Sequence, residues 1–409
     1  MEQYVTTGIG IYNGLGDNAL TSWQSLIDGK SAVSKLSWPE DNPLQFPATH
    51  SNIKVKLAAT SPDPGDVYPD CFTNFWPSWD KNTKSCMMAT HEAVIDAKLT
   101  SKNVGVIVGT FGSGTTLRLE LFSAMNNGLK KMSPRKILNT GLDFPAAQVA
   151  AVYHVMGPNT SLDSACTTGL SSIEQAINTL KADPDLDAMI VGGADHTAEP
   201  IYCYWFQNLG ALNLSDNISS NCPFDLARNG FLMGEGAGCL VIEPMSKAIA
   251  RGAHIHSIIK STSNVTVFTS DTSPDSEGVG AKSCINKALK KSGITADQVS
   301  FINAHGTSTP IGDKIEYDVM LELMPNTVMV SNKGQIGHSM AAAGIIESIY
   351  TILSMQHGIV SGNANLVNPL GTEMILPNQS MKLDIKYAIK NSFGFGGRSA
   401  TMILERYDG

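Results

Sequence analysis

The chain has 409 residues, of which 42% are hydrophobic, 16% charged and 7% aromatic. This composition is typical of a globular protein with a large core, and it excludes a disordered chain, a coiled coil and a collagen-like repeat. The net charge of −8 lacks the basic surplus of nucleic-acid-binding proteins, and no apolar run reaches the roughly 18 residues of a membrane span, so we expect neither nucleic acid nor a membrane span.

Short, nearly continuous apolar runs predict strands that are buried on both faces of a sheet. In chain order they are residues 104–110, 188–194, 238–243, 299–304, 328–332 and 400–404. Apolar residues recur at helical spacing over 168–180 and 345–353. Strands that alternate with helices predict an α/β architecture.

Two stretches lack these patterns. The proline-rich residues 37–80 predict a long irregular excursion, and the polar residues 261–280 predict a mobile loop. A turn of small residues ending in Gly169 precedes one predicted helix, and residues 341–344 resemble it before the other. An internal duplication is therefore one of two open interpretations.

The first candidate for chemistry is Cys166, which small residues surround just before the predicted helix 168–180. The positive end of a helix favours the thiolate, the nucleophilic form of cysteine. The alternative is a buried cysteine at a strand–helix junction. The seven cysteines are scattered and form no CxxC pair, and the first residues lack the features of a signal peptide. We therefore expect reduced thiols in a cytoplasmic protein.

The second candidate is His305, at the end of the predicted strand 299–304. Open α/β sheets place their ligands at such strand ends. Thr307 and Thr309 add hydroxyls, which favour a polar ligand over a purely structural histidine.

The third candidate is His338, which follows the predicted strand 328–332 and precedes the second helix. Glu347 lies on that helix and could pair with Lys333. The alternative is a strand exit stabilised by an ordinary ion pair.

The fourth candidate is the glycine-rich segment 391–398, just before the last strand. Glycines allow close backbone approach and expose N–H groups, as an oxyanion hole requires. The segment lacks the GxxxxGK[ST] pattern of a phosphate loop, and a plain turn is the alternative. Farther upstream, Asp225, Arg228 and Glu235 predict a buried polar network beside the site, with a structural role.

A helix-start cysteine, two strand-end histidines and a glycine-rich donor loop make a coherent acyl-transfer site. On these ordered motifs the chain resembles, over essentially its whole length, the elongation-type β-ketoacyl-acyl-carrier-protein synthases, condensing enzymes of the thiolase superfamily. The resemblance implies an α/β, thiolase-like, five-layered αβαβα fold built from two duplicated halves. Residues 1–245 would carry the nucleophile, and residues 246–409 both histidines and a gating loop.

The resemblance also implies a role for each candidate. Cys166 matches the acyl-accepting nucleophile, and His305 and His338 match the two catalytic histidines. Lys333 and Glu347 match the pair that supports them.

The same resemblance covers the substrate side of the site. Thr307 and Thr309 match positions that hydrogen-bond the phosphopantetheine arm. Phe395 matches the aromatic gate of the acyl pocket, and its N–H would form the oxyanion hole with that of Cys166. Arg398, where the family usually has threonine, could tie the gate to Asp271 or Asp275.

The implied activity is a decarboxylative condensation of an acyl-cysteine with malonyl-acyl-carrier-protein. No metal and no cofactor of its own are expected, because decarboxylation generates the nucleophile and the carrier protein brings the phosphopantetheine. The expected partners are an acyl carrier protein and a second copy of the chain. Departures at Thr167, Asn229 and Arg398 keep an alternative open, a dedicated ketosynthase of a type II polyketide or polyene pathway that pairs with a chain-length-factor-like homologue. The missing second cysteine disfavours a thiolase, and the presence of Cys166 disfavours an inactive partner subunit.

Overall fold

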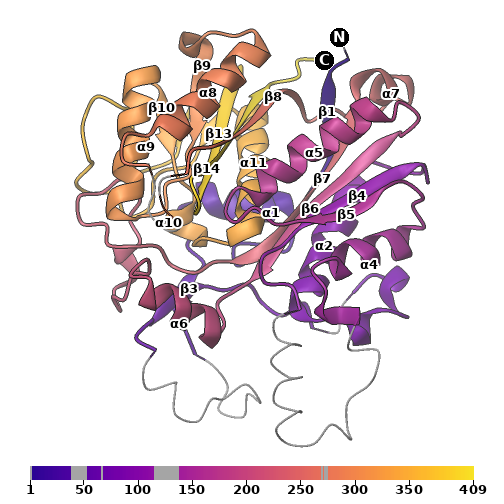
Figure 1. Cartoon of the computed structure of the whole chain (residues 1–409), viewed down its shortest axis with the longest axis horizontal. Coiled ribbons are helices and arrows are strands. Elements are labelled where there is room, and N and C mark those ends of the chain that lie inside the picture. The colour runs from indigo at the N-terminus through magenta and orange to yellow at the C-terminus, as the bar shows by residue number, and fades with distance from the viewer. Residues whose placement is uncertain (1, 38–52, 66–67, 115–137, 269, 271–274) are drawn as a thin grey trace, which may run out of the picture.

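The computed structural model describes residues 2–37, 53–65, 68–114, 138–268, 270 and 275–409. In this part of the chain, one mixed sheet has ten strands in the order β10-β9-β13-β14-β8-β1-β7-β6-β4-β5 (Figure 1). Its strands are β1 (Tyr4–Asn13), β4 (Val104–Gly109), β5 (Asn159–Leu162), β6 (Ala188–His196), β7 (Glu235–Pro244), β8 (Ser257–Thr266), β9 (Val299–Asn303), β10 (Val328–Val330), β13 (Tyr387–Gly394) and β14 (Arg398–Glu405). Two short ribbons pair β2 (Val33–Lys35) with β3 (Leu57–Ala59) and β11 (Ile359–Val360) with β12 (Met381–Lys382).

The helices lie mainly between these strands in the chain. They are α1 (Ala19–Ile27), α2 (Lys81–Asp96), α4 (Phe144–Tyr153), α5 (Thr168–Ala182), α6 (Pro200–Asn208), α7 (Met245–Ala250), α8 (Val279–Ser292), α9 (Pro310–Leu323), α10 (Lys333–Ile336) and α11 (Met340–His357). Single 3₁₀ turns occur at Asp70–Phe72, Trp76–Ser78, Ile218–Ser220 and Ala296–Gln298. No helix in the described part of the chain is both long and apolar enough to cross a membrane.

The strand order repeats itself. The strands β1, β4, β5, β6 and β7 lie in the order third, second, fourth, fifth, first, and β8, β9, β10, β13 and β14 lie in the same order. The two first strands, β1 and β8, pair antiparallel where the halves meet, from Tyr4 opposite Ile259 to Thr6 opposite Ser257. The duplication and the thiolase-like α/β fold are thereby confirmed, and the division between residues 245 and 246 stays a prediction.

Three hydrophobic cores separate the layers. One core packs α2 and α4 against the outer face of the first half-sheet, and another packs α8 and α9 against the outer face of the second. The third core lies between the half-sheets and contains the apolar faces of α5 and α11. The order of the layers is therefore helix, sheet, helix, sheet, helix. In Figure 1 the first half of the chain is coloured from violet to magenta and the second from orange to yellow.

The two central helices touch backbone to backbone at their first turns. A Cβ on Gly169 would lie 2.7 Å from the Ile345 nitrogen and 2.9 Å from the Gly344 Cα, closer than real Cβ atoms come. Only glycine fits there. The small residues that the sequence repeats before both helices are therefore the crossing point of α5 and α11, and this crossing brings the two helix starts together.

The predicted strands all occur, with ends shifted by a few residues. The mobile loop predicted at 261–280 is wrong in its first part, because Ser261–Thr266 continues β8 and pairs with β14. Some of its polar groups bond inside the protein, for example Ser261 Oγ, which donates to the Ala288 carbonyl at 2.8 Å, so polarity there does not mean exposure. Residues 269 and 271–274 of that stretch lie outside the described residues. Within 37–80, the described part is largely irregular apart from β3 and the two 3₁₀ turns.

Candidate active site

Cys166 lies on a tight turn between β5 and α5. Ala165, just before it, has a φ of +55°, a left-handed conformation that is uncommon outside glycine. The Thr168 hydroxyl holds the turn, because it donates to the Ala165 carbonyl at 2.6 Å and accepts the Ser164 N–H at 2.8 Å. Thr167 is the N-cap of α5, so Cys166 stands one residue ahead of the helix cap.

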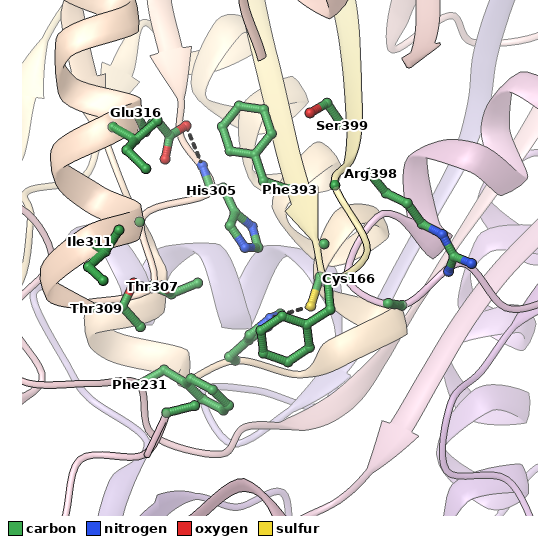
Figure 2. Close-up of a pocket in the computed structure, with 18 of the residues that line it drawn as sticks. Cys166, Phe231, His305, Thr307, Thr309, Ile311, Glu316, Phe393, Arg398 and Ser399 are labelled. Atoms are coloured by element: carbon green, nitrogen blue, oxygen red, sulfur yellow. Dashed lines mark hydrogen bonds between the residues drawn. The ribbon is translucent and has the colours of Figure 1, made fainter. Parts of the chain in front are cut away.

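The two predicted histidines meet at this cysteine, and Figure 2 shows His305 beside Cys166. His338 Nε2 lies 3.0 Å from Cys166 Sγ, within hydrogen-bond reach. The His305 and His338 rings are 5.3 Å apart and nearly perpendicular, and Phe231 and Phe393 pack edge-on against them. The first half of the duplication thus supplies the cysteine, and the second supplies both imidazoles.

Burial decides the protonation of all three groups. It raises the pKa of the Cys166 thiol to about 12, and the nearby Lys333 charge opposes this only partly. It lowers the pKa of His305 and of His338 well below the usual value, with Lys333 adding to the effect. The expectation of a thiolate at a helix end is therefore wrong for Cys166. The resting site holds a thiol beside two neutral imidazoles, one of which can accept its proton.

Two buried side chains, one an acceptor and one a donor, fix the turn that carries His305. Glu316 on α9 accepts the N–H groups of His305 and Gly306, each at 2.8 Å, and Figure 2 shows this contact. The Ser331 hydroxyl donates to the Gly306 carbonyl at 2.6 Å. The imidazole position is therefore set by backbone hydrogen bonds from two other elements.

Lys333 and Glu347 pair as the sequence suggested, with Nζ 2.5 Å from Oε1 and both side chains buried. Sequence reasoning missed a second lysine, Lys390, whose Nζ lies 2.9 Å from the other Glu347 oxygen. The sequence did contain a sign of this residue, because a single lysine interrupts the apolar residues at the start of β13.

Asp195, at the end of β6, is another residue that sequence reasoning missed. Its carboxylate accepts the Phe111 and Gly112 N–H groups on one oxygen and the Ala341 N–H, at 2.7 Å, on the other. Burial raises its pKa to about 7. It therefore links the exit of β4 to the start of α11, directly beside the histidine loop.

The glycine-rich turn lies against the backbone of the turn that carries Cys166. A Cβ on Gly394 would be 3.4 Å from the Cys166 nitrogen, so β13 ends directly beside the Cys166 amide. The Phe395 ring stacks on Phe206 at 6.4 Å, at the wall of the cavity.

The proposed tie between Arg398 and Asp275 is not formed. Both Asp275 oxygens are occupied by local backbone, accepting the Glu277 and Gly280 N–H groups at 3.1 and 3.0 Å. Figure 2 shows Arg398 extending away from Cys166. Asp271, the other partner considered, lies outside the described residues.

A cavity of about 670 Å³ opens onto Cys166, His305 and His338. Thr307 and Thr309 line it with their hydroxyls 3.0 Å apart. Aromatic side chains form much of the remaining wall, namely Phe111, Trp205, Phe206, Phe231 and Phe395. The cavity can therefore take an apolar chain together with a polar arm.

The polar network predicted from Asp225, Arg228 and Glu235 does not form as one unit. Arg228 donates to the Asp225 carbonyl at 2.9 Å and to the Thr309 carbonyl at 3.1 Å. Glu235 lies elsewhere, paired with Lys81 at 2.8 Å. The Arg228 part nevertheless supports the turn that carries Thr309.

The sulfur of Cys166 and one nitrogen of each histidine all lie within 4.8 Å of one another, a spacing that a metal could also use. Among the described residues no fourth side chain joins this group. The 3.0 Å contact between thiol and imidazole suits proton transfer.

Comparisons with known proteins agree with this geometry. A family model described as "Beta-ketoacyl synthase, N-terminal domain" matches residues 1–248, and "Beta-ketoacyl synthase, C-terminal domain" matches residues 257–367. The chain is 30% identical over 423 residues to 3-oxoacyl-[acyl-carrier-protein] synthase 2 of Staphylococcus aureus (strain COL), covering 100% of this chain and 99% of that protein. It is 32% identical over 423 residues to the chloroplastic 3-oxoacyl-[acyl-carrier-protein] synthase II of Arabidopsis thaliana, covering 98% and 75%.

Solved structures show the same fold. A β-ketoacyl synthase from Burkholderia phymatum superposes with a TM-score of 0.87 at 25% identity over the whole of both chains. A type II PKS acyl-carrier protein in complex with its ketosynthase gives 0.86 at 26%, covering 99% of this chain and 100% of that one. The ishigamide ketosynthase/chain length factor gives 0.84 at 25%, covering 99% of each.

Proposed function

Because the chain belongs to the beta-ketoacyl synthase family, we propose that it joins an acyl group held on Cys166 to the two-carbon unit of malonyl-acyl-carrier-protein, with loss of CO₂. The product is a β-ketoacyl-acyl-carrier-protein. The observation that carries this proposal is the 3.0 Å contact between the Cys166 thiol and His338 Nε2, with the His305 ring 5.3 Å from that of His338.

Acyl loading needs a base for the buried thiol. As Cys166 Sγ attacks the carrier thioester, its proton passes to neutral His338. The tetrahedral oxyanion is held by the N–H groups of Cys166 and Phe395, which suits the position of Gly394 against the Cys166 amide. The carrier leaves as a thiolate and takes the proton from His338, so the site returns to its neutral state.

Chain extension needs a place for negative charge. Malonyl-carrier binds with its arm along Thr307 and Thr309, and loss of CO₂ leaves an enolate on the thioester oxygen. His305 and His338 hold that oxygen by hydrogen bonds. The enolate carbon attacks the acyl-cysteine carbonyl, a C–C bond forms, and the Cys166 sulfur leaves as a thiolate. One proton from the solvent, the proton that loss of CO₂ from a carboxylate consumes, then restores the thiol.

A direct assay tests this mechanism. Acyl-carrier and labelled malonyl-carrier should give CO₂ and a product longer by two carbons, seen by mass spectrometry. If neither CO₂ nor the longer product forms, the chain would be an inactive partner subunit. Condensation without CO₂ release would point to a thiolase. Cys166→Ala should abolish the condensation, and retained condensation in that variant would refute the assignment.

The partner that delivers both substrates is an acyl carrier protein. The relatives are named for acyl-carrier-protein substrates, and one similar structure contains such a carrier with its ketosynthase. The same reasoning requires no cofactor in this chain, since phosphopantetheine arrives on the carrier. All seven cysteines are free thiols in the structure, in keeping with the cytoplasmic location expected from the sequence.

A second candidate function is a dedicated ketosynthase of a type II polyketide or polyene pathway. Its support is the likeness to two ketosynthases of such assemblies, with TM-scores of 0.86 and 0.84. For either function we propose a dimer formed near β5, the edge strand of the large sheet, which leads directly to Cys166. Native mass spectrometry combined with the activity assay distinguishes the two candidate functions. An active species of twice the 43.6 kDa chain mass favours the homodimer of fatty-acid elongation, and activity only with an added homologue favours the alternative.

A further inference from the structure

Lys390 is a charged side chain at the centre of the protein that the mechanism above does not use. It comes from β13, opposite Asn303 of β9, and has no exposed surface. Its Nζ lies 2.9 Å from Glu347 Oε2 and 3.2 Å from the Ala304 carbonyl oxygen, and it also contacts the Asn391 carbonyl. An ammonium without compensation is strongly disfavoured in such a place, so its partners explain why it is there.

The buried charges around Lys390 come in equal numbers. Lys333 on α10 and Lys390 face the carboxylates of Glu347 on α11 and Glu316 on α9. The other titratable groups that face this cluster are the neutral His305 and His338, the Cys166 thiol and the Tyr350 hydroxyl, both of which burial keeps protonated by raising the pKa to about 12, and Asp313 beside Glu316, whose pKa burial raises to about 7. With Lys390 charged, two ammonium groups balance two carboxylates. Without that charge, the cluster beside the histidines would be negative.

The cluster also reaches His305 through the backbone. Lys390 holds the carbonyl of Ala304, and Glu316 holds the N–H of His305, so the two groups fix both sides of the single peptide unit that joins Ala304 to His305 at the exit of β9. The position and the electrostatic surroundings of His305 thus depend on the same lysine.

We propose that Lys390 is a positioning residue for the decarboxylation step, which fixes the exit of β9 before His305 and keeps the surrounding cluster from becoming negative as the enolate forms. The inference rests on the proposed condensation. Acyl loading passes through the Cys166 turn and depends much less on Lys390. Decarboxylation, in contrast, places a full negative charge at the histidines.

The ammonium must itself be charged for this role, and that gives a pH signature. Burial lowers the pKa of Lys390 to about 8, partly offset by Glu347. As the pH rises from 7 to 9, the charged fraction falls by about tenfold, and the rate of CO₂ release from malonyl-carrier should fall with it. Acyl loading, followed by mass spectrometry of the Cys166 adduct, should not show this fall.

Two substitutions test the assignment. Lys390→Met removes the charge and the hydrogen bonds, and Lys390→Gln keeps a donor for the Ala304 carbonyl but no charge. At pH 7 both should release CO₂ at least about tenfold more slowly than the wild type, with a smaller loss than the ~10²–10³ of a direct oxyanion donor. Both should also be flat between pH 7 and 9. Lys386→Met is the matched control, because Lys386 lies just before the same strand at the surface and pairs with Asp408.

Each outcome decides the matter. If the rate of CO₂ release in the variants falls between pH 7 and 9 as it does in the wild type, whether or not the rate itself is lower, Lys390 is only structural. If neither variant folds, the wild-type profile decides, and a rate that stays constant up to pH 9 overturns the proposal. If the wild type releases no CO₂ at any pH, the proposed function itself fails, whereas an unchanged profile in active variants removes only the role of Lys390.

Discussion

At the scale of single residues, the proposed nucleophile is stored in its unreactive form. A helix end favours a thiolate, but burial disfavours any charge, and at Cys166 burial prevails. In the proposed mechanism the reaction therefore depends on proton transfer to His338 at the moment of attack.

The reactivity of Cys166 towards iodoacetamide should follow from this. Because the thiol pKa is raised to about 12, the thiolate fraction grows by about tenfold for each pH unit between 7 and 10, and the alkylation rate should grow with it. Peptide mass spectrometry can follow Cys166 separately from exposed Cys71. A rate that levels off near pH 8 would show that the thiolate is stabilised instead.

The two histidines should differ in their effects. His338 contacts the thiol, so His338→Ala should slow both acyl loading and decarboxylation. His305 lies within 4.8 Å of the thiol but makes no hydrogen bond to it among the described residues, so His305→Ala should slow decarboxylation by ~10²–10³ and leave loading nearly intact. Separate assays of the acyl adduct and of CO₂ measure the two steps. Equal loss of both steps in the two variants would contradict this division of labour.

At the scale of elements, the sequence predicts the strands with apolar runs and both central helices, because their pattern is local. It fails at β8, whose hydroxyl-rich residues look like a loop until their partners on α5 and α8 are known, such as Asn264 with Ser171 Oγ at 2.9 Å. It also brings out Cys166, His305 and His338 but not Asp195 or Lys390. The roles of those two exist only through contacts with distant segments, which no local pattern reveals.

The crossing of α5 and α11 should be sensitive to a single methyl group. Gly169→Ala places a Cβ against the backbone of Gly344 and Ile345, and overpacking of this kind typically costs about 1–3 kcal/mol. We expect a lower free energy of unfolding in urea and a larger loss of activity, because both helix starts carry site loops. Asn178→Ala on the exposed face of α5 is the control and should leave both unchanged. Full stability in Gly169→Ala would mean that the helices separate easily.

At the scale of the whole molecule, the site belongs to neither half. The third strand of the first half leads to Cys166, and the third strand of the second leads to Lys333 and His338. The approximate symmetry of the fold thus brings equivalent loops together, and each has acquired a different chemical task. Neither half alone holds both the thiol and an imidazole for it.

The antiparallel contact of β1 with β8 and the glycine crossing have a consequence for covalent continuity. The link between the halves passes through exposed Arg251 and Gly252, and a Cβ on Gly252 would meet nothing within 4 Å. A protease site inserted after Gly252 should therefore be cut without loss of the native assembly. The nicked protein should elute as one particle, keep most of its activity, and separate into two polypeptides only in denaturant. Such behaviour would make this single chain, in physical terms, an intramolecular heterodimer whose peptide link serves mainly to raise the effective concentration of one half for the other.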